Sequence, residues 1–174
     1  MVEHVVSLEM AEAYACLRAI LLRNGCKVIA EEPPTSIFVQ QGSLWGISPK
    51  TAKKTLRYRL SQSDSGTYIS CSSSLSSDWK NLTVIGSALA VIMAAFCWGI
   101  SADLEASIAA QMPSYWSWIA TADGYVDYQA LQMFSTLARV LAVFLAVVIA
   151  LEVVIAVYVH LRIDVFAEEN LRAL

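Results

Sequence analysis

Residues 82–102 read LTVIGSALAVIMAAFCWGISA, twenty-one consecutive residues without a charged side chain. As an α-helix they extend about 31 Å, which matches a hydrocarbon core about 30 Å thick. A second apolar stretch, residues 140–161, holds fifteen Leu, Ile, Val and Phe residues and a single carboxylate, Glu152. Each large apolar side chain favours insertion by roughly 0.3–0.6 kcal/mol, against a cost of roughly 2.5–3.5 kcal/mol for one central charge. The sequence therefore predicts transmembrane helices over 82–102 and 138–161.

The composition of the whole chain favours a small integral membrane protein. Of its 174 residues, 57% are apolar and 16% are charged, whereas a soluble domain has about 45–50% apolar and about 25% charged residues. The alternative for each apolar stretch, a core helix of a soluble fold, needs a larger surrounding domain than 174 residues supply. The net charge of −3, without a basic stripe, argues against a nucleic-acid partner.

Charged residues are distributed unevenly around the two predicted spans. Residues 1–80 carry nine Lys and Arg residues, whereas residues 103–138 carry none and hold four acidic residues. Because Lys and Arg are retained on the cytoplasmic side of a membrane, we expect a multi-pass protein of the cell membrane with both termini in the cytoplasm. The N-terminal residues lack a basic region and a cleavage site, so no signal peptide is expected.

Residues 1–80 have the pattern of a compact α+β cytoplasmic domain. Apolar residues recur at the helical period between Ser7, the expected N-cap, and Asn24 and Gly25, the expected C-cap. Strands are predicted over 4–7, 26–31, 36–41, 55–61 and 67–73, with turns at Pro33 and Pro34 and at residues 64–66. This order predicts an antiparallel sheet with one helix packed on one face.

A serine-rich stretch, residues 61–77, predicts the polar end of a strand followed by a short connector to the membrane. Residues 81–174 are then expected to form an all-α two-helix transmembrane hairpin. Within it, aromatic residues around Pro113 predict interfacial helices in an outer segment, residues 103–136. The tail, residues 162–174, is expected to continue the second span into the cytoplasm, where four of its apolar residues are able to contact the N-terminal domain: Ile163, Val165, Phe166 and Leu171.

The loop GSLWGISPKTAKK, residues 42–54, combines an aromatic residue with three lysines shortly before the first span. Each Lys or Arg beside anionic lipid contributes about 1 kcal/mol of attraction, and Trp suits the headgroup level. One hypothesis is that this loop lies against the inner leaflet, and the alternative is a solvated loop with Trp45 packed on the sheet edge. The residues predicted to contact lipid are Trp45, Lys50, Lys53, Lys54, Arg57, Arg59, Trp79 and Lys80.

Small residues recur at four-residue spacing in both predicted spans, which favours close packing of helices in lipid. The predicted packing residues are Gly86, Ala90, Ala94, Ala142, Ala146 and Ala150. Glu152 lies within the second span, where an ionised carboxylate cannot face lipid, so it is expected to face another helix. It is interpreted as an assembly contact or a proton relay, against the alternative of a neutral acid with only a packing role.

The sequence contains no recognisable catalytic constellation, phosphate-binding loop or metal-ligand spacing. Its four cysteines lack CxxC pairs and are expected to be reduced fillers, so no metal and no cofactor is predicted. The leading interpretation is a non-catalytic membrane subunit, scaffold or anchor that contacts membrane lipids and either further copies of itself or other membrane subunits. The alternatives are a membrane-tethered ligand or lipid sensor and a transport component assembled by oligomerisation around Glu152.

Overall fold

The computed structural model describes residues 2–63, 65–122 and 124–174, so Asp64 of the predicted turn lies outside the described residues. The chain forms two compact units. The first contains Met1–Thr83 together with Val154–Leu174, and the second contains Val84–Val153. This division differs from the predicted boundary between 1–80 and 81–174, because the C-terminal residues belong with the N-terminal ones.

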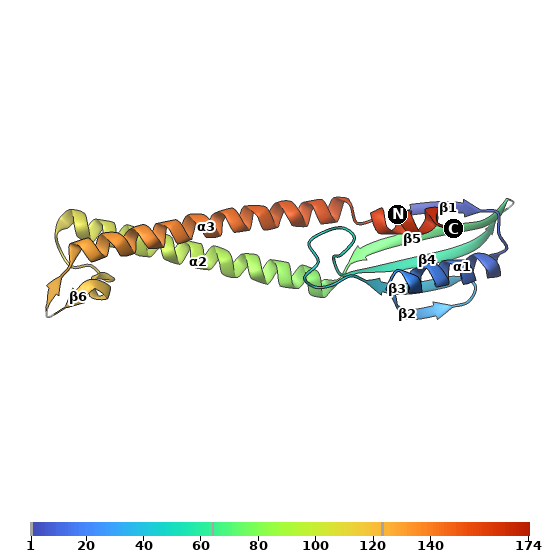
Figure 1. The fold of residues 1–174 in the computed structure, drawn as a ribbon, viewed down its shortest axis with the longest axis horizontal. Coiled ribbons are helices and arrows are strands. Elements are labelled where there is room, and N and C mark those ends of the chain that lie inside the picture. The colour runs from blue at the N-terminus through green and yellow to red at the C-terminus, as the bar shows by residue number, and fades with distance from the viewer. Residues whose placement is uncertain (1, 64, 123) are drawn as a thin grey trace. The chain divides into compact units, whose positions relative to one another are not determined.

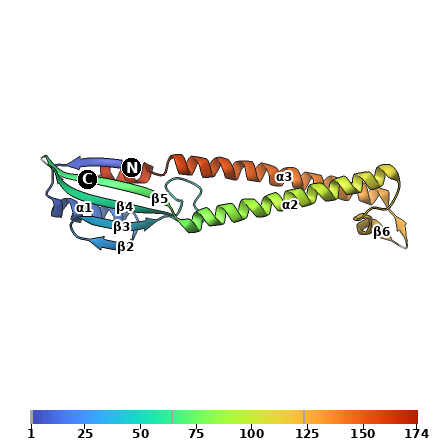
Figure 2. The ribbon, with the colours of Figure 1, turned by 180° about the vertical axis from the view of Figure 1, so that it is seen from behind.

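A five-stranded antiparallel sheet forms the centre of the first unit, as the sequence predicts (Figure 2). Its strand order is β1-β5-β4-β3-β2. The strands are β1 (Val2–Val6), β2 (Lys27–Glu32), β3 (Ser36–Gln41), β4 (Lys54–Ser63) and β5 (Gly66–Leu75). Alternation along β4 decides which way the sheet faces, because Leu56, Tyr58 and Leu60 are buried while Arg57 and Arg59 are exposed.

The predicted strand over 67–73 is confirmed and extends further, so most of the serine-rich stretch belongs to the sheet and Ser76 is the short connector to the next helix. The whole of β4 pairs with the whole of β5, from Lys54 opposite Leu75 to Ser63 opposite Gly66. Buried Thr67, Ile69 and Cys71 alternate with Tyr68 and serines on the other face of β5. This period of two stabilises a half-buried strand even where serine dominates the composition.

Two helices cover one face of the sheet. Helix α1 (Met10–Arg23) ends at Asn24 as predicted, where Gly25 adopts a left-handed φ of +73°. Its N-cap is Glu9 rather than the predicted Ser7. Helix α4 (Val165–Arg172) joins the same core through Phe166, Ala167 and Leu171. The predicted contact of Phe166 and Leu171 with the N-terminal domain is confirmed, but the tail is not one continuous helix with the second span, because a turn over residues 162–164 interrupts it.

The two long apolar helices are α2 (Ser77–Ala110) and α3 (Tyr128–Leu161), each of 34 residues (Figure 1). Both are long and apolar enough to cross a membrane. Both are longer than the predicted spans, since α2 continues beyond 102 and α3 begins before 138. In the second unit they form an antiparallel pair, connected through a short 3-10 helix (Ser117–Ala120) and a small hairpin of β6 (Thr121–Ala122) and β7 (Tyr125–Val126).

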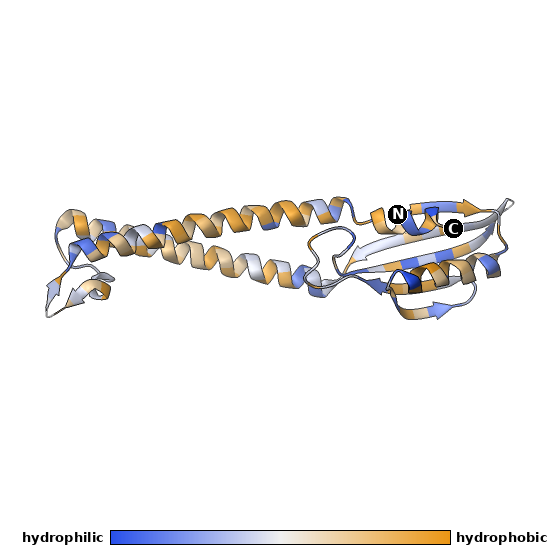
Figure 3. Ribbon diagram, viewed as in Figure 1, coloured by the Kyte–Doolittle hydropathy of each residue, from blue (hydrophilic) through white to orange (hydrophobic). Residues whose placement is uncertain are grey.

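The least exposed residues of this pair recur at alternating spacings of four and three. On α2 they include Ser87, Ala90, Ala94, Cys97, Ser101 and Leu104, and on α3 Leu131, Ser135, Ala138, Ala142, Leu145, Ile149 and Glu152. This 3.5-residue period is typical of helices that pack along a coiled-coil seam. The other sides of both helices carry exposed apolar residues. The hydropathy colouring in Figure 3 shows that apolar residues predominate along most of α3 and much of α2.

Candidate functional site

The connection between β3 and β4, here called the 42–53 loop, is compact and hydrogen-bonded to itself. Ser43 donates its backbone N–H to the carbonyl oxygen of Thr51 at 2.8 Å, and Lys53 donates to that of Ser43 at 2.9 Å. Gly46 is enclosed so tightly that a Cβ there would lie 2.0 Å from the Thr51 carbonyl oxygen. These contacts make the loop an ordered element with its own shape.

Side chains from distant parts of the first unit hold the 42–53 loop in place. The indole Nε1 of Trp79 donates a 3.0 Å hydrogen bond to the Gly46 carbonyl oxygen. Two ion pairs, each at 2.6 Å, join Lys53 to Asp78 of α2 and Lys50 to Glu169 of α4. Ala52 is buried against a cluster formed by the start of α2 and the end of α3: Leu75, Trp79, Ile155, Ala156, Val159 and Ile163.

One edge of the 42–53 loop is apolar and uncovered. Trp45 is 80% exposed, Ile47 is 69% exposed and Leu44 is 37% exposed. The structure therefore disagrees with the alternative in which Trp45 packs on the edge of the sheet. These three exposed apolar side chains lie within four residues and form an apolar patch. Single exposed hydrophobic residues, by contrast, are common on protein surfaces.

Two of the predicted lipid-contact residues are buried in protein instead. Lys54 is fully buried, with its Nζ 4.7 Å from the centre of the Phe166 ring and hydrogen-bonded to the Pro49 carbonyl oxygen. Trp79 is only 7% exposed. The expectation of lipid contact is corrected for both, because Lys54 occupies the buried face of β4 and Trp79 packs under the 42–53 loop.

Burial dominates the ionisation of the core groups around Lys54. It lowers the pKa of the Lys54 ammonium to about 8, although nearby Glu169 and Asp164 oppose the shift. Burial also raises the pKa of the Cys26 thiol to about 11 and that of Cys71 to about 12. Both thiols therefore stay protonated at neutral pH, unlike the thiolate of a reactive cysteine.

The remaining predicted lipid-contact residues lie on the surface of the first unit, at separate places. Lys80 is exposed on the first turn of α2, and Lys50 and Lys53 carry the ion pairs described above. Arg57 and Arg59 project from the open face of the sheet, where the Arg57 guanidinium lies 5.2 Å from the centre of the Phe38 ring. They share no face with Lys54, since neighbouring residues of a strand point to opposite sides.

In the second unit, Glu152 of α3 lies beside Gly86 of α2. One carboxylate oxygen, Oε1, lies 3.6 Å from the position that a Cβ on Gly86 would take. Among the described residues, no hydrogen bond or ion pair to Glu152 is found. A Cβ at Gly86 would therefore lie in ordinary van der Waals contact with the carboxylate.

The predicted packing residues are divided by the seam of the helix pair. Ala90, Ala94 and Ala142 lie on it, whereas Ala146 and Ala150 are exposed. Ala146 and Ala150 do not pack between α2 and α3 of one chain, because a strict four-residue spacing drifts around the helix away from a 3.5-residue seam. An oligomer seam, the other arrangement for which they were predicted, remains a prediction.

Polar residues near the connection between α2 and α3 were missed by the sequence analysis. The hydroxyls of Ser101 and Ser135 are buried and lie 3.1 Å apart, bridging α2 and α3. Beside them, Glu105 forms an ion pair with Arg139. The signal that could have found them is the shared seam position of the two serines, seven residues on from Ala94 and seven before Ala142.

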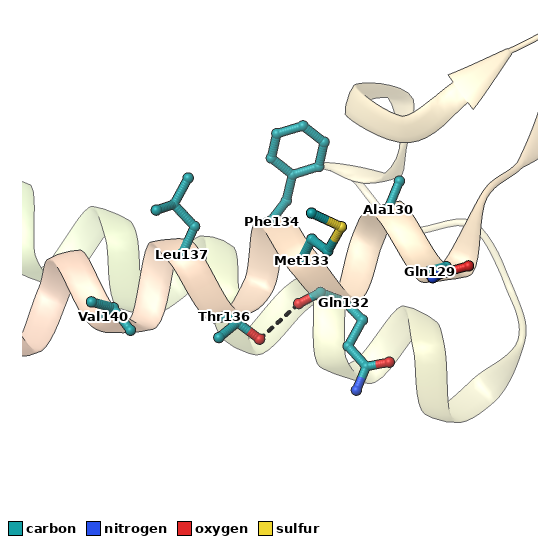
Figure 4. A pocket seen from close by; sticks show the side chains of 8 residues that line it. All are labelled: Gln129, Ala130, Gln132, Met133, Phe134, Thr136, Leu137 and Val140. Atoms are coloured by element: carbon teal, nitrogen blue, oxygen red, sulfur yellow. Dashed lines mark hydrogen bonds between the residues drawn. The ribbon is translucent and has the colours of Figure 1, made fainter.

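A surface hollow in the second unit runs along α3 (Figure 4). All its lining residues belong to this one helix: Gln129, Ala130, Gln132, Met133, Phe134, Thr136, Leu137 and Val140. It therefore represents the exposed side of a helix rather than an enclosed ligand site.

Over the described ranges, no group of three or more His, Cys, Asp and Glu residues is arranged to hold a metal ion. Comparison with family models, with curated proteins and with solved structures finds no match to this chain. Its function is therefore argued from its own residues.

Proposed function

We propose that this chain is a membrane anchor and scaffold, in which α2 and α3 cross the cell membrane and hold the sheet domain at its cytoplasmic face. On this proposal the chain acts as a non-catalytic subunit that contacts lipid and either further copies of itself or other membrane proteins. The exposed apolar sides of α2 and α3 support insertion. In the most apolar segment of each helix, only 6% is buried inside the protein.

The observation that carries the proposal is the attachment of the sheet domain to both apolar helices. The first unit contains the start of α2 and the end of α3, which pack together through Trp79, Ile155 and Val159. Beyond α3, helix α4 completes the core of the sheet domain with Phe166 and Leu171. A domain tethered at two points has less freedom than one on a single flexible linker, which suits a fixed scaffold.

The charge distribution supports the orientation. Lys and Arg are frequent in the first unit, whereas residues 103–138 contain none. The positive-inside rule then puts the sheet domain in the cytoplasm and the connection between α2 and α3 outside.

Labelling of cysteines in intact cells tests insertion and orientation together. Native Cys16 is exposed on the sheet domain, and Tyr125→Cys introduces a thiol at a residue that is exposed on β7. A membrane-impermeant maleimide is expected to label position 125 in intact cells and Cys16 only after permeabilisation. Release of the protein from membranes by alkaline carbonate, or labelling of Cys16 in intact cells, would overturn the proposal.

A subunit or scaffold role predicts stable neighbours. Affinity purification in mild detergent, followed by native mass spectrometry, is expected to recover either defined membrane proteins or a defined homo-oligomer. A monomer carrying a bound small molecule would instead favour a sensor.

A further inference from the structure

We propose that the 42–53 loop is a third membrane contact, which inserts Leu44, Trp45 and Ile47 into the interfacial layer of the bilayer. The inference rests on the proposed function, because it needs α2 and α3 to cross that bilayer. It adds a specific lipid-binding element to the sheet domain and identifies the residues that perform it.

The apolar edge of the loop is exposed although the loop itself is ordered. Its backbone is closed by the Ser43–Thr51 and Lys53–Ser43 hydrogen bonds, and Gly46 permits the close approach to Thr51. In a loop whose shape was set only by hydrophobic collapse, the Trp side chain would turn inward. Here the backbone contacts hold Trp45 and Ile47 on the outside.

The level of the loop is set by its attachment to α2 and α3 within the first unit. Gly46 is hydrogen-bonded to Trp79, which lies three residues before Leu82, where the charge-free stretch begins. Ala52 packs in the same cluster as Val159, inside the second apolar stretch. The loop is therefore level with the ends of both predicted spans, where a bilayer changes from headgroups to hydrocarbon.

The residue types of the apolar edge fit this level. Trp is enriched at membrane interfaces because its ring is largely apolar and its N–H remains polar. The end of α3 also carries exposed apolar side chains, at Val157, Tyr158 and Leu161.

The charges of the loop distinguish apolar insertion from electrostatic attraction. Lys50 and Lys53 are paired with Glu169 and Asp78, and Lys54 is buried. Their positive charges are thus largely compensated inside the protein. We therefore expect insertion to depend on the apolar edge and to change little with the content of anionic lipid.

Site-specific fluorescence in nanodiscs tests the insertion. In a Cys16→Ser background, an environment-sensitive fluorophore is attached to Ile47→Cys, to Val5→Cys or to Val147→Cys. The other native cysteines are buried, and the background protein without an added cysteine measures residual labelling. Val5 is the matched control, an exposed β-branched residue on β1, paired through Tyr68 with Ser61. Ser61 is seven residues along β4 from Lys54, where the strand begins after the loop, about 23 Å at 3.3 Å per residue.

Purified full-length protein is placed in nanodiscs of phosphatidylcholine, with or without phosphatidylglycerol, that contain a lipid with a quencher near the headgroup. The probe at position 47 is expected to shift to the blue and to lose at least half of its intensity, while the probe at position 5 changes little. The phosphatidylglycerol content should alter the quenching at position 47 by less than a factor of two.

Position 147, exposed on α3, reports on the proposed span, with a quencher near the acyl-chain centre. Quenching at 147 without quenching at 47 overturns the loop insertion and leaves the anchor proposal standing. Failure at both positions overturns the anchor proposal itself. A third outcome is that position 47 is protected from labelling in native membranes but is not quenched in nanodiscs. The loop would then be covered by a partner protein, and the proposed insertion would be overturned.

Discussion

The indole nitrogen of Trp79, at the start of α2, donates a 3.0 Å hydrogen bond to the carbonyl oxygen of Gly46 in the 42–53 loop. The two residues are 33 positions apart, and the bond is buried. It connects the element that displays Trp45 to the helix that is proposed to enter the membrane. The strength of this hydrogen bond therefore affects how firmly the 42–53 loop is attached to α2.

Trp79→Phe should loosen the loop without unfolding the sheet. The change removes the hydrogen bond but keeps most of the packing, and leaves the Gly46 carbonyl without its buried donor, which costs about 1–3 kcal/mol. Hydrogen exchange of the amides of Ser43, Lys53 and Ala52 should become faster. The control is Trp98→Phe, at an exposed residue of the second unit, which should leave exchange in the loop unchanged. Equal exchange in the two variants would contradict the anchoring role of Trp79.

Gly46→Ala should distort the loop. The added Cβ would lie 2.0 Å from the Thr51 carbonyl oxygen, so the backbone must move. We expect a loss of about 2 kcal/mol or more in the free energy of unfolding, measured by denaturant titration in detergent. Gly99→Ala is the matched control, because nothing lies within 4 Å of its Cβ position in α2 and alanine favours a helix. Equal stability of the two variants would contradict the tight loop closure.

Lys54 predicts a pH dependence of the stability of the sheet domain. Its pKa is lowered from 10.5 to about 8 by burial, so between pH 8 and 10.5 the unfolded chain binds more protons than the folded one. Stability from this group therefore rises with pH through that window, by up to about 3 kcal/mol, and the penalty of the buried charge is present in full below pH 8.

Lys54→Met isolates most of this contribution, because the opposing effect of the Cys71 thiol cancels in the difference between the two proteins. The Cys26 thiol interacts with Lys54, so its effect cancels only in part. The stability of the native protein relative to the variant should rise from pH 7.5 to pH 10, measured by chemical denaturation. Lys27→Met, at an exposed residue of β2, controls for the change in net charge. A difference that stays constant with pH would show that Lys54 remains charged in the fold.

Glu152 is proposed to contribute to assembly within the membrane. Because its carboxylate lies beside Gly86, Glu152→Leu removes the polar group while keeping an apolar side chain, and Glu152→Gln keeps hydrogen-bonding capacity. The particle size in mild detergent, measured by light scattering, should fall for Glu152→Leu and be better preserved for Glu152→Gln. Ala150→Leu, at an exposed position, is the control for added bulk. Unchanged size in both Glu152 variants would leave this residue with a packing role only.

Much of the first unit could be predicted because its signals are local. Alternation of Leu56, Tyr58 and Leu60 with arginines is present in the sequence itself and decides the buried face of β4. The strand over 67–73 was predicted in the same way, from Ile69 and Cys71 on one face, and β5 extends it by one residue before and two after. Alternation decides such a strand, since it brings the apolar residues to one face.

The candidate site was predicted only in part. The 42–53 loop and Trp45 are conspicuous by composition, but the burial of Lys54 depends on Phe166, more than a hundred residues away. Similarly, Ala146 and Ala150 satisfy the expected four-residue spacing and still lie off the seam. Hydropathy alone gives little indication of which side of a uniformly apolar helix faces its neighbour.

The sequence by itself determined the two long apolar helices, the antiparallel sheet with α1, and the choice of the 42–53 loop as a distinctive element. These features follow from periodicity and hydropathy among residues that are near each other in the chain. The sequence also indicated that Phe166 and Leu171 could contact this domain, but only the tertiary structure decided that α4 packs into its core, that Lys54 is buried beside Phe166, and that Trp79 holds Gly46. Each of these contacts joins residues 33 or more positions apart. Such contacts depend on how helices, strands and loops pack against one another in three dimensions. They leave no periodic pattern in the sequence.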